Sequence, residues 1–197
     1  NQLNELRAND LRFTSTEAST FLTKIFNLSL TPEQITMLEN RTEGWIAGLQ
    51  MAALSLQGRV DISRFIEKFS GSHRFIMDYL TEEALNRQSR ETQDFLLRTS
   101  ILERLNGPLC DFILEGITNQ EIGIAQSDND ISTFRRESQS LLAELESANL
   151  FIVPLDDERT WYRYHHLFAD LLRSRLEQGS PELLPLLHKR ASNWFEN

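Results

Sequence analysis

The chain has 197 residues, which is enough for one large or two small domains with a buried core. Its content of 40% apolar and 25% charged residues is typical of a globular protein in water. The net charge of −9 argues against direct nucleic-acid contact, because that affinity comes mainly from Lys and Arg side chains that neutralise phosphates.

Cysteine content and hydropathy predict a cytoplasmic protein without a membrane partner. The single cysteine, Cys110, excludes an internal disulfide framework and fits a reducing compartment. The longest uncharged stretch, residues 45–58, is too short to span a bilayer, and no secretory signal is visible. Because Asn1 is not a natural start, we expect the chain to be a piece of a longer protein.

The first half of the chain predicts short helices. The stretch Asn1–Phe13 alternates loosely and is expected to be an edge strand. Each of the five helices that follow is predicted from a cap, a helix-starting proline or an apolar stripe. Their expected starts are Thr14 (with Glu17 completing a capping box), Thr31 (followed by Pro32), about Thr42 (running to Leu56), Asp61 and Ser72 (after a break at Gly71). Together they predict an all-helical unit that ends near Gln88.

Apolar residues at helical spacing predict which faces of these helices are buried. In the first helix the stripe comprises Ala18, Phe21, Leu22, Ile25 and Phe26. The fifth helix is expected to run through Phe75, Ile76, Tyr79, Leu80 and Leu85.

A second unit is predicted to begin at Ser89. One helix carries Phe95–Leu97 and ends before Asn106, and a short helix spans Leu109–Leu114. The polar stretch Thr118–Ser132 is expected to be an exposed loop. The next helix covers Glu137–Ala148, and its leucines Leu141, Leu142 and Leu145 are expected to point inward.

The most specific pattern is a hairpin followed by a helix. Leu150–Leu155 predicts a strand, Asp156–Arg159 a charged turn, and Thr160–Tyr164 a second strand that meets a helix from His165 to about Gln178. After a break at Gly179, a last helix carries Leu183, Leu187, Ala191 and Trp194. The expected fold is therefore mainly α, with a helical bundle domain followed by a winged-helix domain that has one β-hairpin.

The residues that carry enzyme chemistry are missing from the sequence. No Walker-type phosphate loop, Gly-x-Ser-x-Gly elbow or zinc-binding cysteine pair occurs, so the chain is not expected to be an enzyme. His165 either packs at the strand-to-helix corner and bonds a backbone carbonyl, or donates to a phosphate at the helix N-terminus. Gly44 and Trp45 either pack at a helix start or approach a flat ligand such as an adenine ring.

Several motifs occur in an order that resembles the MalT-like, LuxR-type ATP-dependent transcriptional regulators, which belong to the signal-transduction ATPases with numerous domains. The resemblance spans nearly the whole chain except residues 118–137. Its motifs are Leu11–Ala18, Arg41–Gln50, Gly71–Arg74, Phe95–Leu102, Ala148–Phe151 and Tyr162–Phe168.

The resemblance implies a division into four segments. Residues 1–13 would end a preceding ATPase domain, 14–88 would form the helical domain, 89–178 the winged-helix domain, and 179–197 the start of an arm or superhelical region. The parent protein would bind ADP or ATP and slowly hydrolyse ATP, whereas no cofactor is expected for the chain alone.

The resemblance also implies sites and partners. His165, at the histidine of an Arg-Met-His-Asp type motif, would contact the nucleotide phosphate, and Gly44–Trp45 would contact the nucleotide from the helical domain. The expected partners are the parent's own nucleotide-binding and sensor domains, with the inducer bound elsewhere and an oligomer in the active state. The segment would couple nucleotide state to inducer sensing and oligomerisation.

Two other functions stay open. A helical protein-interaction scaffold would show an exposed apolar patch at Leu184, Leu187 and Trp194. A DNA-binding winged helix is less favoured, because the helix Glu137–Ala148 has no Lys or Arg and the hairpin turn is acidic.

Overall fold

The computed structural model describes residues 12–69, 74–115 and 137–196. The chain divides into two compact units, residues 1–79 and 80–197. The expected edge strand within residues 1–11, the cap at Ser72 and the loop 118–132 lie outside the described residues, and the four-segment division stays a prediction. Within the described ranges no helix is long and apolar enough to cross a membrane.

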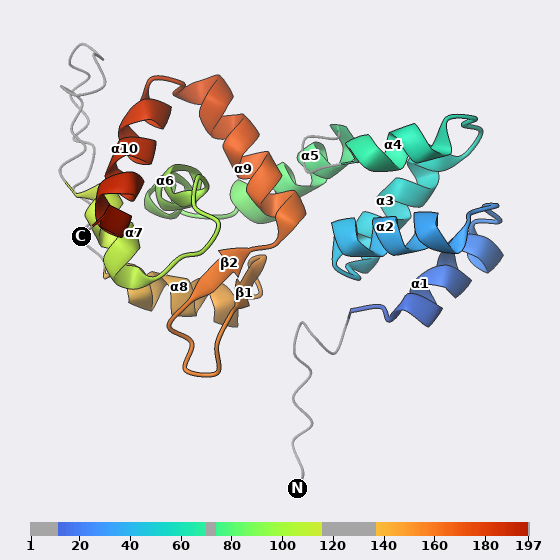
Figure 1. The fold of residues 1–197 in the computed structure, drawn as a ribbon, viewed down its shortest axis with the longest axis horizontal. Coiled ribbons are helices and arrows are strands. Elements are labelled where there is room, and N and C mark those ends of the chain that lie inside the picture. The colour runs from blue at the N-terminus through green and yellow to red at the C-terminus, as the bar shows by residue number, and fades with distance from the viewer. Residues whose placement is uncertain (1–11, 70–73, 116–136, 197) are drawn as a thin grey trace, which may run out of the picture. The chain divides into compact units, whose positions relative to one another are not determined.

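Unit 1 is built from short helices, of which α1, α3 and α4 pack against α2 (Figure 1). The described helices are α1 (Ser15–Thr20), the π-helical turn η2 (Phe21–Ile25), α2 (Pro32–Thr42), α3 (Ile46–Leu56), α4 (Ile62–Lys68) and α5 (Arg74–Leu80). The capping boxes that start α1 and α2 form as predicted, because Thr14 and Thr31 each accept from the backbone N–H three residues on. Asp61 stands at the N-cap of α4, although its side chain makes no capping hydrogen bond.

Two expectations for unit 1 are wrong. Thr42 does not start the third helix but ends α2, and α3 begins only at Ile46. Ile25 is 68% exposed instead of buried, because the wider π-helical turn rotates it away from the face that a 3.6-residue period assigns. On α5 the residues Ile76 and Leu80 are buried, whereas Phe75 and Tyr79 lie on the exposed face.

Unit 2 is a winged helix flanked by further helices. Its described elements are the π-helical turn η3 (Thr81–Leu85), α6 (Arg90–Thr99), α7 (Gly107–Leu114), α8 (Ser138–Ser147), β1 (Ile152–Pro154), β2 (Tyr162–Tyr164), α9 (His166–Gly179) and α10 (Leu183–Glu196). β1 and β2 pair antiparallel, with Val153 opposite Arg163. Leu105 adds a single bridge to Tyr162 on the other side of β2, through backbone bonds of 2.7 and 2.8 Å.

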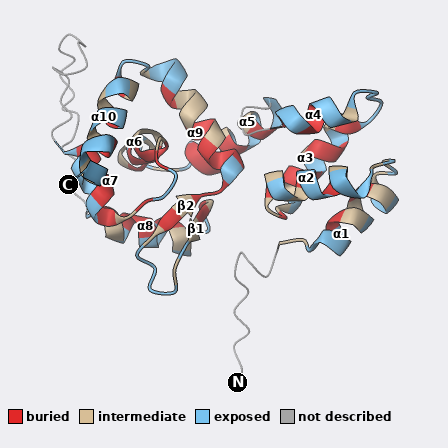
Figure 2. Cartoon of the chain, viewed as in Figure 1, coloured by how far each residue is buried: buried red, intermediate tan, exposed pale blue. Residues whose placement is uncertain are grey.

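The core of unit 2 lies among α6, α7, α8 and α9, where Figure 2 shows many buried residues. The predicted inward leucines of α8 are all buried, as are the apolar residues at helical spacing on α9. Cys110 is fully buried on α7, and loss of solvent raises the pKa of its thiol. The mainly α fold with one β-hairpin is therefore confirmed.

Candidate functional site

His165 is the N-cap residue of α9, at the corner where β2 ends. Its Nδ1 atom accepts a hydrogen bond from the backbone N–H of Leu167, at 3.3 Å. Because Nδ1 accepts, the proton of the neutral ring is on Nε2. The ring thus takes the role that Ser, Thr, Asp or Asn usually has at a helix start.

His165 is buried at the corner. The residue is only 4% exposed, and its ring meets that of Phe151 edge-on with centroids 5.9 Å apart. Its backbone N–H donates to the Phe151 carbonyl at 2.7 Å, which fixes the corner. The neighbouring His166 is exposed, so the two imidazoles lie in opposite environments. Burial of the ring agrees with packing at the corner, whereas a bond from the ring to a backbone carbonyl and the nucleotide contact both stay predictions.

Gly44 lies in the turn between α2 and α3 rather than in a helix. Both Glu43 and Gly44 have positive φ angles, of 50° and 72°, and they end α2 in the left-handed conformation. The Gly44 carbonyl accepts from Phe13 N–H at 2.9 Å, and a Cβ atom at Gly44 would stand 2.6 Å from the Phe13 carbonyl oxygen. Glycine is required because the preceding chain segment passes directly over it.

Trp45 is the N-cap residue of α3, and its side chain makes no capping hydrogen bond. Its ring lies over the first turn of the helix, where a Cβ atom at Gly48 would come within 2.7 Å of the ring. The Tyr79 ring packs against it with centroids 5.6 Å apart. Gly44 and Trp45 are thus brought together in unit 1, whereas His165 belongs to unit 2, and the nucleotide contacts of all three stay predictions.

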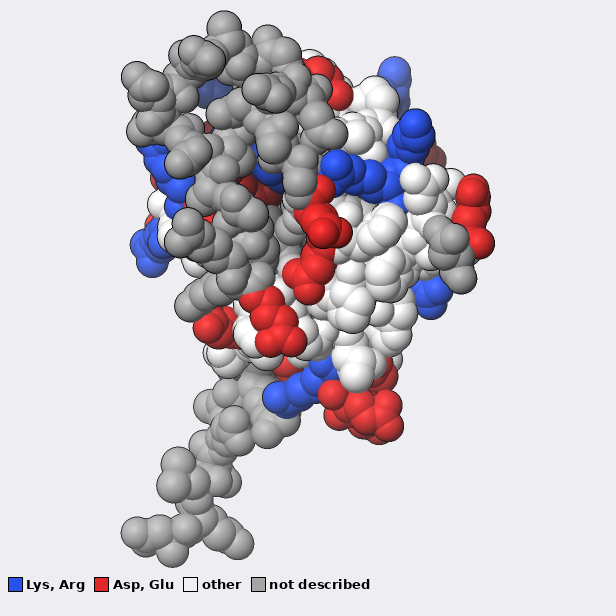
Figure 3. Space-filling model, turned by 90° about the vertical axis from the view of Figure 1, so that its left-hand side faces the viewer, with Lys and Arg blue, Asp and Glu red and all other residues white. Residues whose placement is uncertain are grey.

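The hairpin turn is held by the side chain of Asp156. Its Oδ1 accepts from Thr160 N–H at 2.8 Å, and its Oδ2 accepts from Trp161 N–H at 3.1 Å and from the Thr160 hydroxyl. The hydroxyl bond, chiefly, holds the pKa of Asp156 below its usual value. Figure 3 shows acidic side chains gathered at the lower end of this face of unit 2, where the hairpin projects.

The turn is also tied to α8, which occupies the position of a recognition helix. Arg159 forms an ion pair with Glu146 at 3.4 Å, and its carbonyl accepts from Gln139 Nε2 at 2.9 Å. Gln139 Oε1 in turn accepts from Gly107 N–H at 2.8 Å, so one side chain links α7, α8 and the turn. The helix α8 itself has no Lys or Arg, so it offers no cation for phosphate binding.

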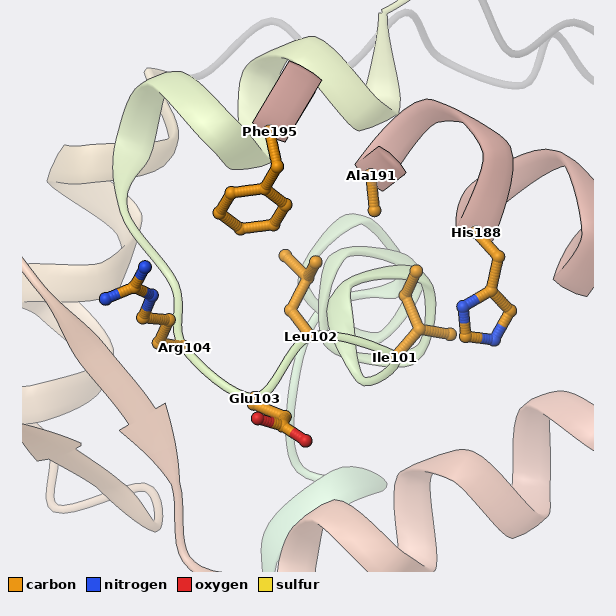
Figure 4. Close-up of a pocket in the computed structure, with 7 residues that line it drawn as sticks. All are labelled: Ile101, Leu102, Glu103, Arg104, His188, Ala191 and Phe195. Atoms are coloured by element: carbon orange, nitrogen blue, oxygen red, sulfur yellow. The ribbon is translucent and has the colours of Figure 1, made fainter. Parts of the chain in front are cut away.

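Unit 2 also contains an open cleft of about 610 Å³ that no sequence pattern predicts. It is lined by Ile101, Leu102, Glu103, Arg104, His188, Ala191 and Phe195 (Figure 4). The Arg104 guanidinium lies 4.8 Å from the centroid of the Trp161 ring and 5.9 Å from that of Phe195. The lining residues come from the segment after α6 and from α10, so only the folded chain brings them together.

The exposed apolar patch that a scaffold would show at Leu184, Leu187 and Trp194 does not form. Leu187 is fully buried in a cluster with Leu176 and Leu183, and Leu184 packs against that cluster. Trp194 is half-buried, and its ring lies 5.4 Å from that of Phe112. Among the described residues, no group of three or more His, Cys, Asp or Glu side chains could hold a metal ion.

Comparison with known proteins identifies relatives over nearly the whole chain. The chain is 34% identical over 194 residues to the serine/threonine-protein kinase PknK of Mycobacterium tuberculosis. The matched region covers 98% of the chain and 16% of that kinase. It is 31% and 32% identical over 199 residues to the HTH-type transcriptional regulators MalT of Cronobacter sakazakii and Yersinia pestis, covering 98% of the chain and 20% of each regulator. The chain therefore spans between about a sixth and a fifth of the length of these relatives.

A family model described as the MalT winged helix domain matches residues 81–184. This range begins at η3 and contains α6, α7, α8, the hairpin and α9. The chain belongs to the MalT winged-helix domain family.

Proposed function

We propose that the chain is a regulatory, non-catalytic segment of an ATP-dependent transcription activator, in which it couples nucleotide state to inducer sensing and oligomerisation. The observation that carries the proposal is the combination of a MalT-type winged helix with an acidic hairpin turn and an α8 free of Lys and Arg. Such a surface is suited to contact with other protein domains rather than with a nucleic-acid backbone.

In the proposed parent, His165 contacts the phosphate of ADP or ATP held by a separate nucleotide-binding domain. The geometry supports this role because Nδ1 is engaged by α9, so the ring orientation is fixed and the N–H is on Nε2. An N–H donor at a helix N-terminus is well suited to an anionic oxygen. Gly44 and Trp45, at the start of α3, would contact the nucleotide from the helical unit.

The coupling needs a difference in affinity between two nucleotide states. A ligand shifts a conformational equilibrium only as far as it binds the two states unequally. A coupling of about 1–3 kcal/mol would bias the parent by a factor of about five to a hundred. The partners in this scheme are the parent's own nucleotide-binding and sensor domains, in the cytoplasm, with the inducer bound outside this chain.

The test is ADP retention by the intact parent protein carrying His165→Asn or His165→Ala. Asparagine keeps a side-chain oxygen that caps α9 but lacks the imidazole, so it separates the two roles of the histidine. We expect both variants to release ADP at a rate about tenfold or more above that of the wild type, and to be active without inducer. The exposed neighbour His166→Asn serves as the matched control. Normal ADP retention in a stably folded His165→Asn parent would overturn the proposed contact.

A helical protein-interaction scaffold is the second candidate, and the cleft beside Arg104 is the observation that favours it. It predicts partner binding that does not change with the nucleotide. Measuring the parent's self-association with ADP and with ATP separates the two functions, since only the regulatory segment requires the two values to differ.

A further inference from the structure

The cleft of unit 2 combines an apolar floor with a positioned cation. Figure 4 shows Ile101 and Leu102 between Phe195 and His188, with Arg104 beyond one side and Glu103 on the lower edge. Arg104 is exposed, yet its stacking against Trp161 and Phe195 holds the guanidinium in place. Arginine and aromatic side chains around an apolar floor are the composition enriched at binding hot spots.

The hairpin turn of the same chain offers the complementary chemistry. Leu155 is 47% exposed, and the next carboxylates, Asp157 and Glu158, are exposed as well. Asp156 is different because its oxygens bond Thr160 and Trp161 within the turn. Among the described residues no ion pair involves Asp157 or Glu158, so the turn presents one apolar side chain beside two available carboxylates.

The tip of the hairpin turn is held away from the cleft of its own molecule, although Trp161 at the base of the hairpin packs against Arg104. The bonds from Gln139 and Glu146 to Arg159 hold the turn against α8. Figure 1 shows the turn between β1 and β2 projecting away from α10, which supplies one side of the cleft. A second molecule can present the tip of its turn to the cleft, where the exposed carboxylates Asp157 and Glu158 complement the charge of Arg104.

We propose that a second copy of this chain docks its hairpin turn in the cleft, with Leu155 on the apolar floor and Asp157 and Glu158 paired with Arg104. Both surfaces are fixed before contact, which reduces the ordering cost of association. Glu103 disfavours a free anion in the cleft, whereas a turn adds the contact of Leu155 with the floor and directs its carboxylates to the Arg104 end. This contact rests on the proposed function, since it would join two chains in the oligomer of the active parent.

The test is sedimentation velocity of the 197-residue chain over a concentration series. A small mixed interface predicts a dissociation constant on the order of 100 µM that rises between about 50 and 500 mM NaCl. Arg104→Glu alone, or Asp157→Lys with Glu158→Lys, is expected to weaken association about tenfold or more. Mixing the two variants is expected to restore it, because the reversed cleft then meets a reversed turn.

The matched control is Arg64→Glu, which makes the same charge change at an exposed position of α4 in unit 1. Circular dichroism and thermal melting establish that each variant folds. A wild-type chain that stays monomeric at about 1 mM overturns the proposal, since contacts weaker than that are rarely specific. The proposal is also overturned if the charge-reversal variants associate as strongly as the wild type, or if the folded variants do not associate when they are mixed. None of these results alters the ADP-retention test of His165, so failure of the two proposals can be told apart.

Discussion

The phenolic oxygen of Tyr164 lies 2.7 Å from the Oγ1 atom of Thr99, and this buried contact joins β2 to α6. The Thr99 hydroxyl donates its proton to the Phe95 carbonyl at 2.7 Å, so the Tyr164 hydroxyl is the donor between the two side chains. Removal of the Thr99 hydroxyl therefore leaves the Tyr164 hydroxyl without its acceptor, whereas removal of the Tyr164 hydroxyl leaves the bond from Thr99 to Phe95 intact.

We expect Thr99→Val to lower the free energy of unfolding by about 2 kcal/mol, because it leaves the buried Tyr164 hydroxyl without its acceptor. Tyr164→Phe should cost only about 1 kcal/mol, since Thr99 keeps its bond to Phe95. Urea denaturation followed by circular dichroism measures both values. Equal costs, or a larger cost for Tyr164→Phe, would contradict the assigned direction of the bond.

Tyr164 also predicts how stability depends on pH in alkali. Burial raises the pKa of its phenol far above the ordinary value. Below the unfolded pKa of about 10 the phenol is neutral in both states, and its contribution to stability is fully present. As the pH rises toward the higher folded pKa, the unfolded chain releases the proton first, so this contribution is lost.

The check is the free energy of unfolding at several pH values between about 8 and 11, for the wild type and for Tyr164→Phe. We expect the variant to lose less stability over this range, even though it starts lower. Burial also raises the pKa of Cys110, so Cys110→Ala should reduce the dependence further. Parallel curves for the wild type and Tyr164→Phe would show that Tyr164 makes no such contribution.

The elements that sequence predicts best are those set by local chemistry. The caps at Thr14 and Thr31, the charged turn after β1 and the buried face of α9 all follow from neighbouring residues. Ile25 is missed because periodicity assumes an α-helix, whereas η2 closes a π-helical bond from Phe26 N–H to the Phe21 carbonyl. The α2–α3 turn could have been predicted, since glycine after a helix favours a left-handed stop.

The sequence predicts the position of His165 but not the cleft. Position in a motif places His165 at the corner of the winged helix, but pattern alone does not show that its Nδ1 atom caps α9. The cleft is not visible in any sequence window, because Arg104 meets Trp161 and Phe195 only after the segment following α6, the hairpin and α10 have packed. Such sites depend on tertiary contacts between residues distant in the chain.

Asp156 predicts the acid sensitivity of the hairpin turn. Bonds from Thr160 lower the pKa of its carboxyl group, so the carboxylate stabilises the turn above the unfolded pKa of about 3.9. This contribution is lost as the pH falls through the lower folded pKa. Asp156→Ala should speed amide hydrogen exchange at Thr160 and Trp161 at neutral pH, as measured by NMR. Asp157→Ala, a change at an exposed neighbour, should leave both rates near wild type, and unchanged rates in Asp156→Ala would refute the role of the carboxylate.

Alanine variants of Gly44 and Gly58 distinguish the cost of backbone strain from the cost of a steric clash within unit 1. Both glycines have positive φ angles, of 72° and 75°, so alanine at either position costs about 1 kcal/mol in backbone strain. At Gly58 a Cβ atom would meet nothing within 4 Å, whereas at Gly44 it would stand 2.6 Å from the Phe13 carbonyl oxygen. We therefore expect Gly58→Ala to lower the free energy of unfolding by about 1 kcal/mol and Gly44→Ala by about 3 kcal/mol, in the range of severe packing changes.

Chemical denaturation of the two variants measures this difference. The Gly44→Ala change should also break the bond between Phe13 N–H and the Gly44 carbonyl, which exposes that amide to hydrogen exchange. If both variants lose the same stability and the Phe13 amide stays protected, the close passage of the chain over Gly44 is not what requires glycine there. If the losses differ as expected, any nucleotide that contacts this turn has to approach it from a side other than the one that Phe13 covers.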